Sequence, residues 1–275
     1  MLKLTNTKVI VAGSIVETYT YPADRLLAYN FTVSNRCKVH SRNTGTDIES
    51  LKRKTESNKR SMRRASLELR KLVNANAWQY RTSLGIVCTP LFATFTFSDD
   101  IRDVRTANNI FLKFIRRLNY KLSGKSKKGC LRYVSVIGFQ DKNREGVVHY
   151  HSVFFNLEQG KESFLQAIWK SGIVDIKKIE DSENVGLYMS KHIVESSGNV
   201  LLGSHKRYFA SKGLYKAVEI KDQSKAQSII EFIPSDYIPK KNIFSGFQGI
   251  VKCSTYKLNK GETLLDIVPE IKMFL

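Results

Sequence analysis

The stretch of residues 131–156, LRYVSVIGFQDKNREGVVHYHSVFFN, decides the fold of this chain. It holds two runs rich in β-branched and aromatic residues, 131–140 and 147–156, separated by the polar segment DKNREG. Such runs are typical of β-strands, and a polar, glycine-containing loop between them is typical of an antiparallel pair. The stretch therefore predicts a β-hairpin with a longer loop.

Helix and strand patterns alternate on both sides of this hairpin. The dense apolar run IVCTPLFATFTF (86–97) predicts a strand buried on both faces, and a helix follows it at 103–122, where apolar residues recur at helical spacing. After the hairpin, the patterns predict a helix, a strand and a helix at 162–172, 173–179 and 184–197. The order β-α-β-β-α-β-α predicts an α+β fold, a mainly antiparallel five-stranded sheet with flanking helices.

The segments outside this unit differ from it in composition. The first 40 residues read as short strands, such as KVIVAG, and the tail holds short strand-like pieces, KRYFAS, AVEI and SIIEFI, with no long helix. We therefore divide the chain into an N-terminal extension (1–83), a central domain (84–215) and a β-rich C-terminal segment (216–275) of unassigned role.

The N-terminal extension contains a strongly basic helical segment. Residues 41–83 hold eleven Lys and Arg against four Asp and Glu, and residues 48–74 contain neither Gly nor Pro, which predicts a helix. Its apolar stripe is partial, so much of the helix is expected to be exposed. It suits either contact with phosphates, for which we select Arg60, Arg63, Arg64 and Arg70, or a solvated surface.

The whole chain carries a formal charge of +20 over 275 residues, with 45 Lys and Arg against 25 Asp and Glu. This excess of positive charge indicates a polyanionic partner, most simply nucleic acid. No apolar run approaches the roughly 20 residues of a membrane span, and the first residues lack the pattern of a secretion signal. The four scattered cysteines fit free thiols in a reducing compartment, so we expect an intracellular, cytoplasmic protein without a membrane partner.

His149 and His151 are the sharpest candidates for a functional site. At i and i+2 on a strand, their side chains project from one face and are able to bind one divalent metal ion if a neighbouring strand adds a ligand. Gln140 and Asp141, at the end of the partner strand, are both placed to do so. The alternative is two ordinary histidines on a half-buried strand.

Tyr188 and Lys191 share a face of the predicted helix at 184–197, because they are three residues apart. A tyrosine hydroxyl is able to act as a nucleophile on a phosphodiester, and a nearby ammonium group is able to stabilise charge or position the substrate. Alone, this spacing has almost no specificity; its order after the His pair gives it meaning.

In that order, the chain resembles the HUH endonucleases, which initiate rolling-circle replication of phages, plasmids and small circular DNA viruses. LFATFTF resembles the family's first motif, HYHSVFF its metal-binding motif, and YMSKHI its nucleophile motif. Less specific similarity in SMRRASLELRKLVNAN and GSHKRYFASKGL extends the resemblance to roughly residues 58–215. Many relatives carry a Glu in the strand before the His pair, where this chain has Gly138, Gln140 and Asp141.

The resemblance implies an α+β palm and a defined chemistry. Mg²⁺ or Mn²⁺ held by His149, His151 and Gln140 would activate the scissile phosphate of single-stranded origin DNA. Tyr188 would form a 5′-phosphotyrosine link and release a 3′-OH primer, with Lys191 assisting, and the strand would later be rejoined. With a single nucleophile, the protein would act as a monomer or transient dimer.

The resemblance also implies partners and alternatives. A host helicase and DNA polymerase would complete replication, in the host nucleus if the replicon is eukaryotic. The same chemistry also serves transposases and relaxases, although a nucleophile that follows the metal motif favours replication initiators. A non-catalytic nucleic-acid-binding protein is the alternative of another class.

Overall fold

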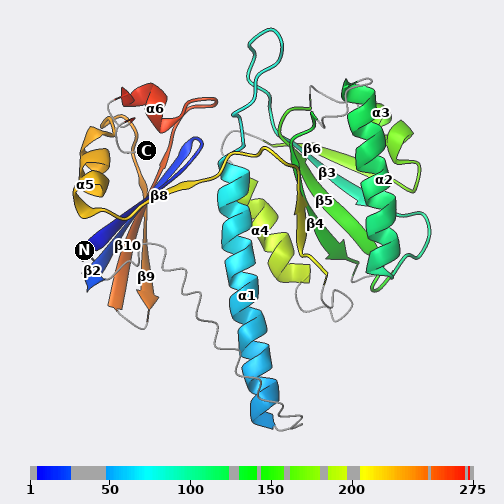
Figure 1. Cartoon of the computed structure of the whole chain (residues 1–275), viewed down its shortest axis with the longest axis horizontal. Helices are drawn as coiled ribbons and strands as arrows, with labels where there is room; N and C mark the ends of the chain where they lie inside the picture. Colours follow the sequence, from blue (N-terminus) through cyan, green and yellow to red (C-terminus); the bar gives the residue numbers. More distant parts are fainter. Residues whose placement is uncertain are drawn as a thin grey trace.

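The computed structural model describes residues 5–25, 48–123, 130–140, 144–157, 162–179, 185–196, 205–246, 249–269 and 272. Within these residues the chain forms two five-stranded antiparallel sheets and six helices (Figure 1). The predicted α+β class is therefore confirmed. We call the two sheets the central sheet and the terminal sheet.

The central sheet is built around the predicted hairpin. Its strands pair antiparallel throughout, in the order β6 (Val174–Lys178), β3 (Leu91–Thr96), β5 (Val148–Phe154), β4 (Tyr133–Phe139) and β7 (Tyr208–Ala210). Strand β3 is shorter than the predicted 86–97, because residues 86–90 lie outside the sheet apart from one isolated bridge, Arg81 to Val87.

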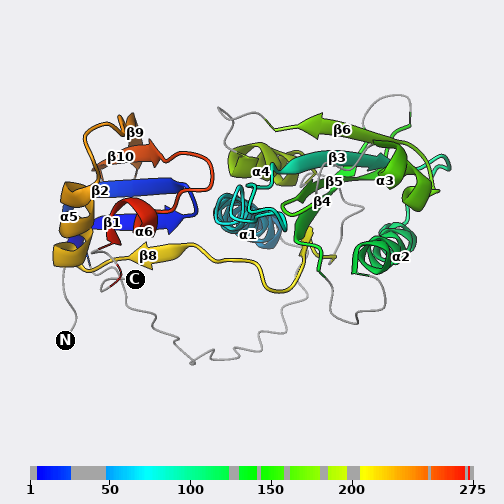
Figure 2. The ribbon, with the colours of Figure 1, turned by 90° about the horizontal axis from the view of Figure 1, so that it is seen from above.

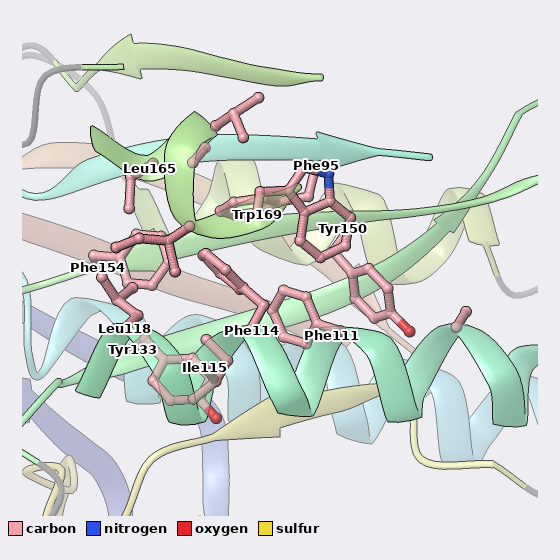
Figure 3. Close-up of a cluster of buried hydrophobic side chains, with 14 of the residues drawn as sticks. Phe95, Phe111, Phe114, Ile115, Leu118, Tyr133, Tyr150, Phe154, Leu165 and Trp169 are labelled. Atoms are coloured by element: carbon pink, nitrogen blue, oxygen red, sulfur yellow. The ribbon is translucent and has the colours of Figure 1, made fainter. Parts of the chain in front are cut away.

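One face of the central sheet packs against α2 (Val104–Ser123) and α3 (Glu162–Trp169) (Figure 2). Aromatic rings fill this core: Tyr150 stacks on Phe111 at 4.1 Å between ring centroids, and Phe95 and Trp169 pack beside them (Figure 3). Tyr150 also donates a hydrogen bond of 2.7 Å to Asn108. Because Tyr150 points into this core, its neighbours on β5 point to the opposite face.

That opposite face is covered by α1 (Ile48–Asn74) and α4 (Val185–Ser196), whose apolar side chains pack on Phe92, Val136 and Val153. The two helices approach closely at Gly186. A Cβ atom there would lie 2.9 Å from Cγ of Asn74, so only glycine fits without displacing a helix. The Asn74 side chain accepts a hydrogen bond from the Gly186 N–H at 3.0 Å, which fixes the first turn of α4.

The terminal sheet joins the two ends of the chain. Its antiparallel order is β8 (Val218–Ile220), β1 (Thr5–Ala12), β2 (Ile15–Arg25), β10 (Gly249–Lys257) and β9 (Lys240–Gly246). Helices α5 (Gln223–Phe232) and α6 (Leu264–Ile267) contribute to the core on one of its faces. The N-terminal strands and the C-terminal segment thus form a single layer.

One strand prediction in the tail is wrong. The apolar run SIIEFI lies in α5 up to Phe232, because Asp222 caps that helix by accepting a hydrogen bond from the Lys225 N–H. Ala226, Ile229 and Ile233 then fall at helical spacing and are buried against the terminal sheet.

Helix α1 lies between the two sheets in both views (Figures 1 and 2). On one side it packs against α4 and the central sheet. On the other, Arg70 binds both carboxylate oxygens of Glu17 at 2.7 Å, and Lys71 pairs with Glu219. Among the described residues, no helix is both long and apolar enough to span a membrane.

Candidate active site

The two histidines of β5 converge on each other. His149 and His151 both project toward the α1 and α4 side of the central sheet, and their Nε2 atoms lie 2.9 Å apart. Two nitrogens bound at about 2.1 Å to adjacent positions of an octahedral cation lie about 3.0 Å apart. The separation therefore fits a shared divalent ion; it also fits a hydrogen bond between one protonated and one bare ring nitrogen.

Gly138 makes room for this arrangement. It lies directly opposite His149 in the β4–β5 register. A Cβ atom at position 138 would lie 2.7 Å from Cε1 and 2.9 Å from Cδ2 of His149, and closer still to Nε2. Real Cβ contacts are not this short, so the imidazole occupies space that any other residue would fill.

Thr94 orients the second histidine. It lies opposite His151 in the β3–β5 register, and its Oγ1 is 3.2 Å from His151 Nδ1. A hydrogen bond donated by Nδ1–H to Thr94 leaves Nε2 as the bare, metal-binding nitrogen. Burial, together with the neighbouring His192, His149 and Lys177, lowers the pKa of His151 to about 2. His151 is therefore neutral at physiological pH, the state that ligates metals.

A third metal ligand stays a prediction. Gln140 continues the β4 register one pair beyond Phe139: its N–H donates to Val147 O at 2.9 Å, which puts it on the His149 side of the strand pair. Asp141, the other predicted ligand, lies outside the described residues. Within the described part of the chain, no three His, Cys, Asp or Glu side chains are grouped to hold a metal ion, a search that does not include amides such as Gln140.

Helix α4 brings Tyr188 to the same side of the central sheet. The Tyr188 ring lies edge-on to Phe92 at 4.9 Å and to His192 at 5.1 Å between centroids. His192 in turn stacks on His151 at 3.9 Å. A continuous set of ring contacts therefore connects the predicted nucleophile to a predicted metal ligand.

His192 is the residue of this site that the sequence interpretation did not select. The sequence favours a surface residue of the helix, whereas the structure stacks His192 on His151 and also on Phe92, at 6.0 Å. Its spacing carried a usable signal, because residues four apart share a helix face and His192 follows Tyr188 by four. Lys191 is exposed on α4.

The four predicted DNA-binding arginines of α1 divide into two groups. Arg60, Arg63 and Arg64 are exposed, and Arg60 makes a solvent-exposed pair with Glu56 at 3.4 Å. Arg70 is half-buried and held by Glu17, whose side chain is 7% exposed. Arg70 thus links α1 to the terminal sheet, while the first three are placed to reach phosphates.

The site lies inside a recognisable segment. Residues 90–197 match the model of a replication-associated protein family that is named after ORF2, and this segment spans β3 to α4 and includes both histidines and Tyr188. The chain matches no curated protein and no solved structure. The family match covers less than half of the chain, and it supports a role as a replication initiator.

Proposed function

We propose that this protein initiates replication by nicking single-stranded origin DNA through Tyr188 and later rejoining the strand. The observation that supports the proposal best is the ring contact of Tyr188 and His151 with the same His192, inside the segment that matches a replication family. A nucleophile beside a pair of converging imidazoles is an arrangement suited to phosphoryl transfer.

The His pair would hold a divalent cation, Mg²⁺ or Mn²⁺. His149 and His151 supply neutral nitrogens at a suitable separation, and Gln140 is the proposed third ligand. When bound, the cation supplies Lewis-acid polarisation of the scissile phosphate. Thr94 holds His151 in the tautomer that ligates.

In the nicking step, the Tyr188 phenolic oxygen attacks the scissile phosphorus. The P–O bond to the Tyr188 oxygen forms as the phenol loses its proton, and the P–O3′ bond breaks as the leaving 3′ oxygen gains one. The products are a 5′-phosphotyrosine and a free 3′-OH, so neither oxidant nor nucleotide is consumed. The reverse step, attack by a 3′-OH on the phosphotyrosine, rejoins the strand.

Two residues of α4 would assist Tyr188. His192 fixes the ring of Tyr188 from one side, as Phe92 does from another. Lys191, exposed one residue earlier, supplies positive charge near the phosphate.

A nicking assay on single-stranded oligonucleotides with and without Mn²⁺ tests the proposal. We expect wild-type protein to form a covalent DNA adduct that denaturing electrophoresis resolves, and Tyr188→Phe to form none. Tyr120→Phe is the matched control, because Tyr120 is 63% exposed on α2, on the other side of the central sheet.

The metal requirement is tested separately. His149→Ala should abolish the adduct while binding of single-stranded DNA and its salt dependence are kept. An adduct that persists in Tyr188→Phe, or a folded wild type that never forms one, contradicts the proposed chemistry.

A further inference from the structure

The hairpin of β9 and β10 extends beyond the rest of the terminal sheet. Strand β10 pairs with β2 from Lys252 to Lys257, whereas its first residues, Gly249 to Val251, pair with β9 alone in the described part of the chain. Strand β9 is the outer edge of this sheet (Figure 2). The outer half of the hairpin is therefore a two-stranded ribbon with both faces open.

The charge of this hairpin is entirely positive. Residues 240–257, KKNIFSGFQGIVKCSTYK, contain four lysines and no acidic residue. Lys241 and Lys252 lie on one face of the hairpin and Lys240 on the other, and all three are exposed. Lysines on an edge strand also prevent sheets from joining, so charge alone does not identify a partner.

Exposed apolar side chains accompany the lysines. Ile243 is 70% exposed, Ile250 57% and Phe244 52%. Ile243 lies directly opposite Lys252 in the register, and Ile250 lies on the same face. Edge protection does not require exposed Ile and Phe, and such a group marks an interaction surface.

We propose that this ribbon binds a groove of duplex DNA, as a second contact separate from the nicking site. A two-stranded ribbon fits the major groove, lysines contact the flanking phosphates, and apolar side chains meet thymine methyl groups or base steps. A second copy of this chain is a poorer partner for the same surface, because two all-positive ribbons repel each other.

The proposal is tested by the salt dependence of duplex binding, measured by fluorescence anisotropy in the Tyr188→Phe background so that nicking plays no part. The probe is a short DNA duplex of arbitrary sequence. Each lost phosphate contact lowers the slope of log K against log salt by about 0.9, so Lys241→Ala/Lys252→Ala should lower it by about 2. Ile243→Ser/Ile250→Ser should weaken duplex binding with the slope kept.

The matched control is Lys113→Ala/Lys121→Ala, which removes two exposed lysines of α2 and should leave the slope unchanged. In the Tyr188-containing protein, the ribbon variants should still nick a single-stranded oligonucleotide; loss of nicking in Tyr188→Phe alone leaves the duplex result intact. An unchanged slope and affinity in both ribbon variants overturns the proposal. So does a wild-type dimer, seen by light scattering, that Ile243→Ser/Ile250→Ser converts to monomer.

Discussion

Gly138 shows how a missing side chain shapes the candidate metal site. The His149 imidazole lies over this glycine, where a Cβ atom would contact three atoms of the ring. The sequence showed an absent carboxylate at this strand; the structure shows that the space is used by the histidine opposite. The pairing that makes this so, Gly138 with His149, depends on the exact length of the hairpin loop, which composition does not determine.

We therefore predict that Gly138→Ala weakens metal binding without unfolding the protein. The added methyl group should rotate His149 away from His151 and lower the affinity for Mn²⁺ by about 10- to 100-fold, as changes beside metal ligands do. Isothermal titration calorimetry measures this directly. In a His149→Ala background the same substitution should cause no further loss, and an equal loss there would show that it acts elsewhere.

His192 is predicted to position Tyr188 rather than to bind metal. His192→Ala removes the ring between Tyr188 and His151, and a displaced nucleophile is expected to lower the nicking rate by about 10²-fold. His192→Phe keeps a planar ring and should restore much of that rate. Both variants should keep the wild-type Mn²⁺ affinity in calorimetry; if His192→Ala abolishes metal binding instead, the positioning role is wrong.

At the scale of elements, local signals predicted the central domain well. The helix expected at 48–74 is Ile48–Asn74, and the hairpin strands lie within the predicted 131–140 and 147–156. Each rests on a long periodic pattern or on a bounded apolar run. SIIEFI failed because a six-residue apolar run does not separate strand from helix, and the deciding signal was the cap at Asp222, before the run began.

The orientation of α4 depends on its contact with α1, which no local pattern reveals. Asn74, 4% exposed, accepts the Gly186 N–H from a helix more than a hundred residues away. Asn74→Ala leaves that buried N–H unpaired and should lower the free energy of unfolding by about 1–3 kcal/mol, measured by urea denaturation. Nicking should fall as well, because Tyr188 lies on the same helix.

The control for this prediction is Asn109→Ala, at an exposed position of α2. It should change the unfolding free energy by less than about 0.5 kcal/mol, as surface substitutions usually do. If Asn74→Ala is equally silent, the hydrogen bond to Gly186 does not hold α4 in place.

At the scale of the whole molecule, the two sheets are tied together by ion pairs on α1. Glu17 lies in β2, Arg70 in α1 and Glu219 in β8, so each pair joins segments that are far apart in sequence. The sequence pattern grouped Arg70 with its neighbours on the helix as a DNA contact, since a charge pattern does not reveal which arginine meets a buried carboxylate. The pairing of the N-terminal strands with the tail was equally hidden, because strand partners distant in sequence leave no local trace.

Glu17→Gln tests what this connection contributes to stability. Removing one charge of a largely buried pair leaves the Arg70 guanidinium poorly compensated and should cost about 3 kcal/mol of unfolding free energy, at the low end for such pairs because Arg70 is 20% exposed. Arg102→Ala, which breaks an exposed pair with Asp100 at 3.2 Å, is the control and should cost less than about 1 kcal/mol.

The same variant tests whether the fixed geometry matters for DNA. If the ribbon of β9 and β10 holds duplex while the His and Tyr188 site holds a single strand, a substrate with both parts binds more tightly than either part alone, because the second contact becomes intramolecular. Glu17→Gln loosens the terminal sheet from α1 and should reduce that gain while leaving affinity for the isolated duplex and the isolated strand unchanged. Anisotropy titrations with the joined and separate substrates measure the difference, and an undiminished gain would mean that the two DNA contacts do not depend on this ion pair.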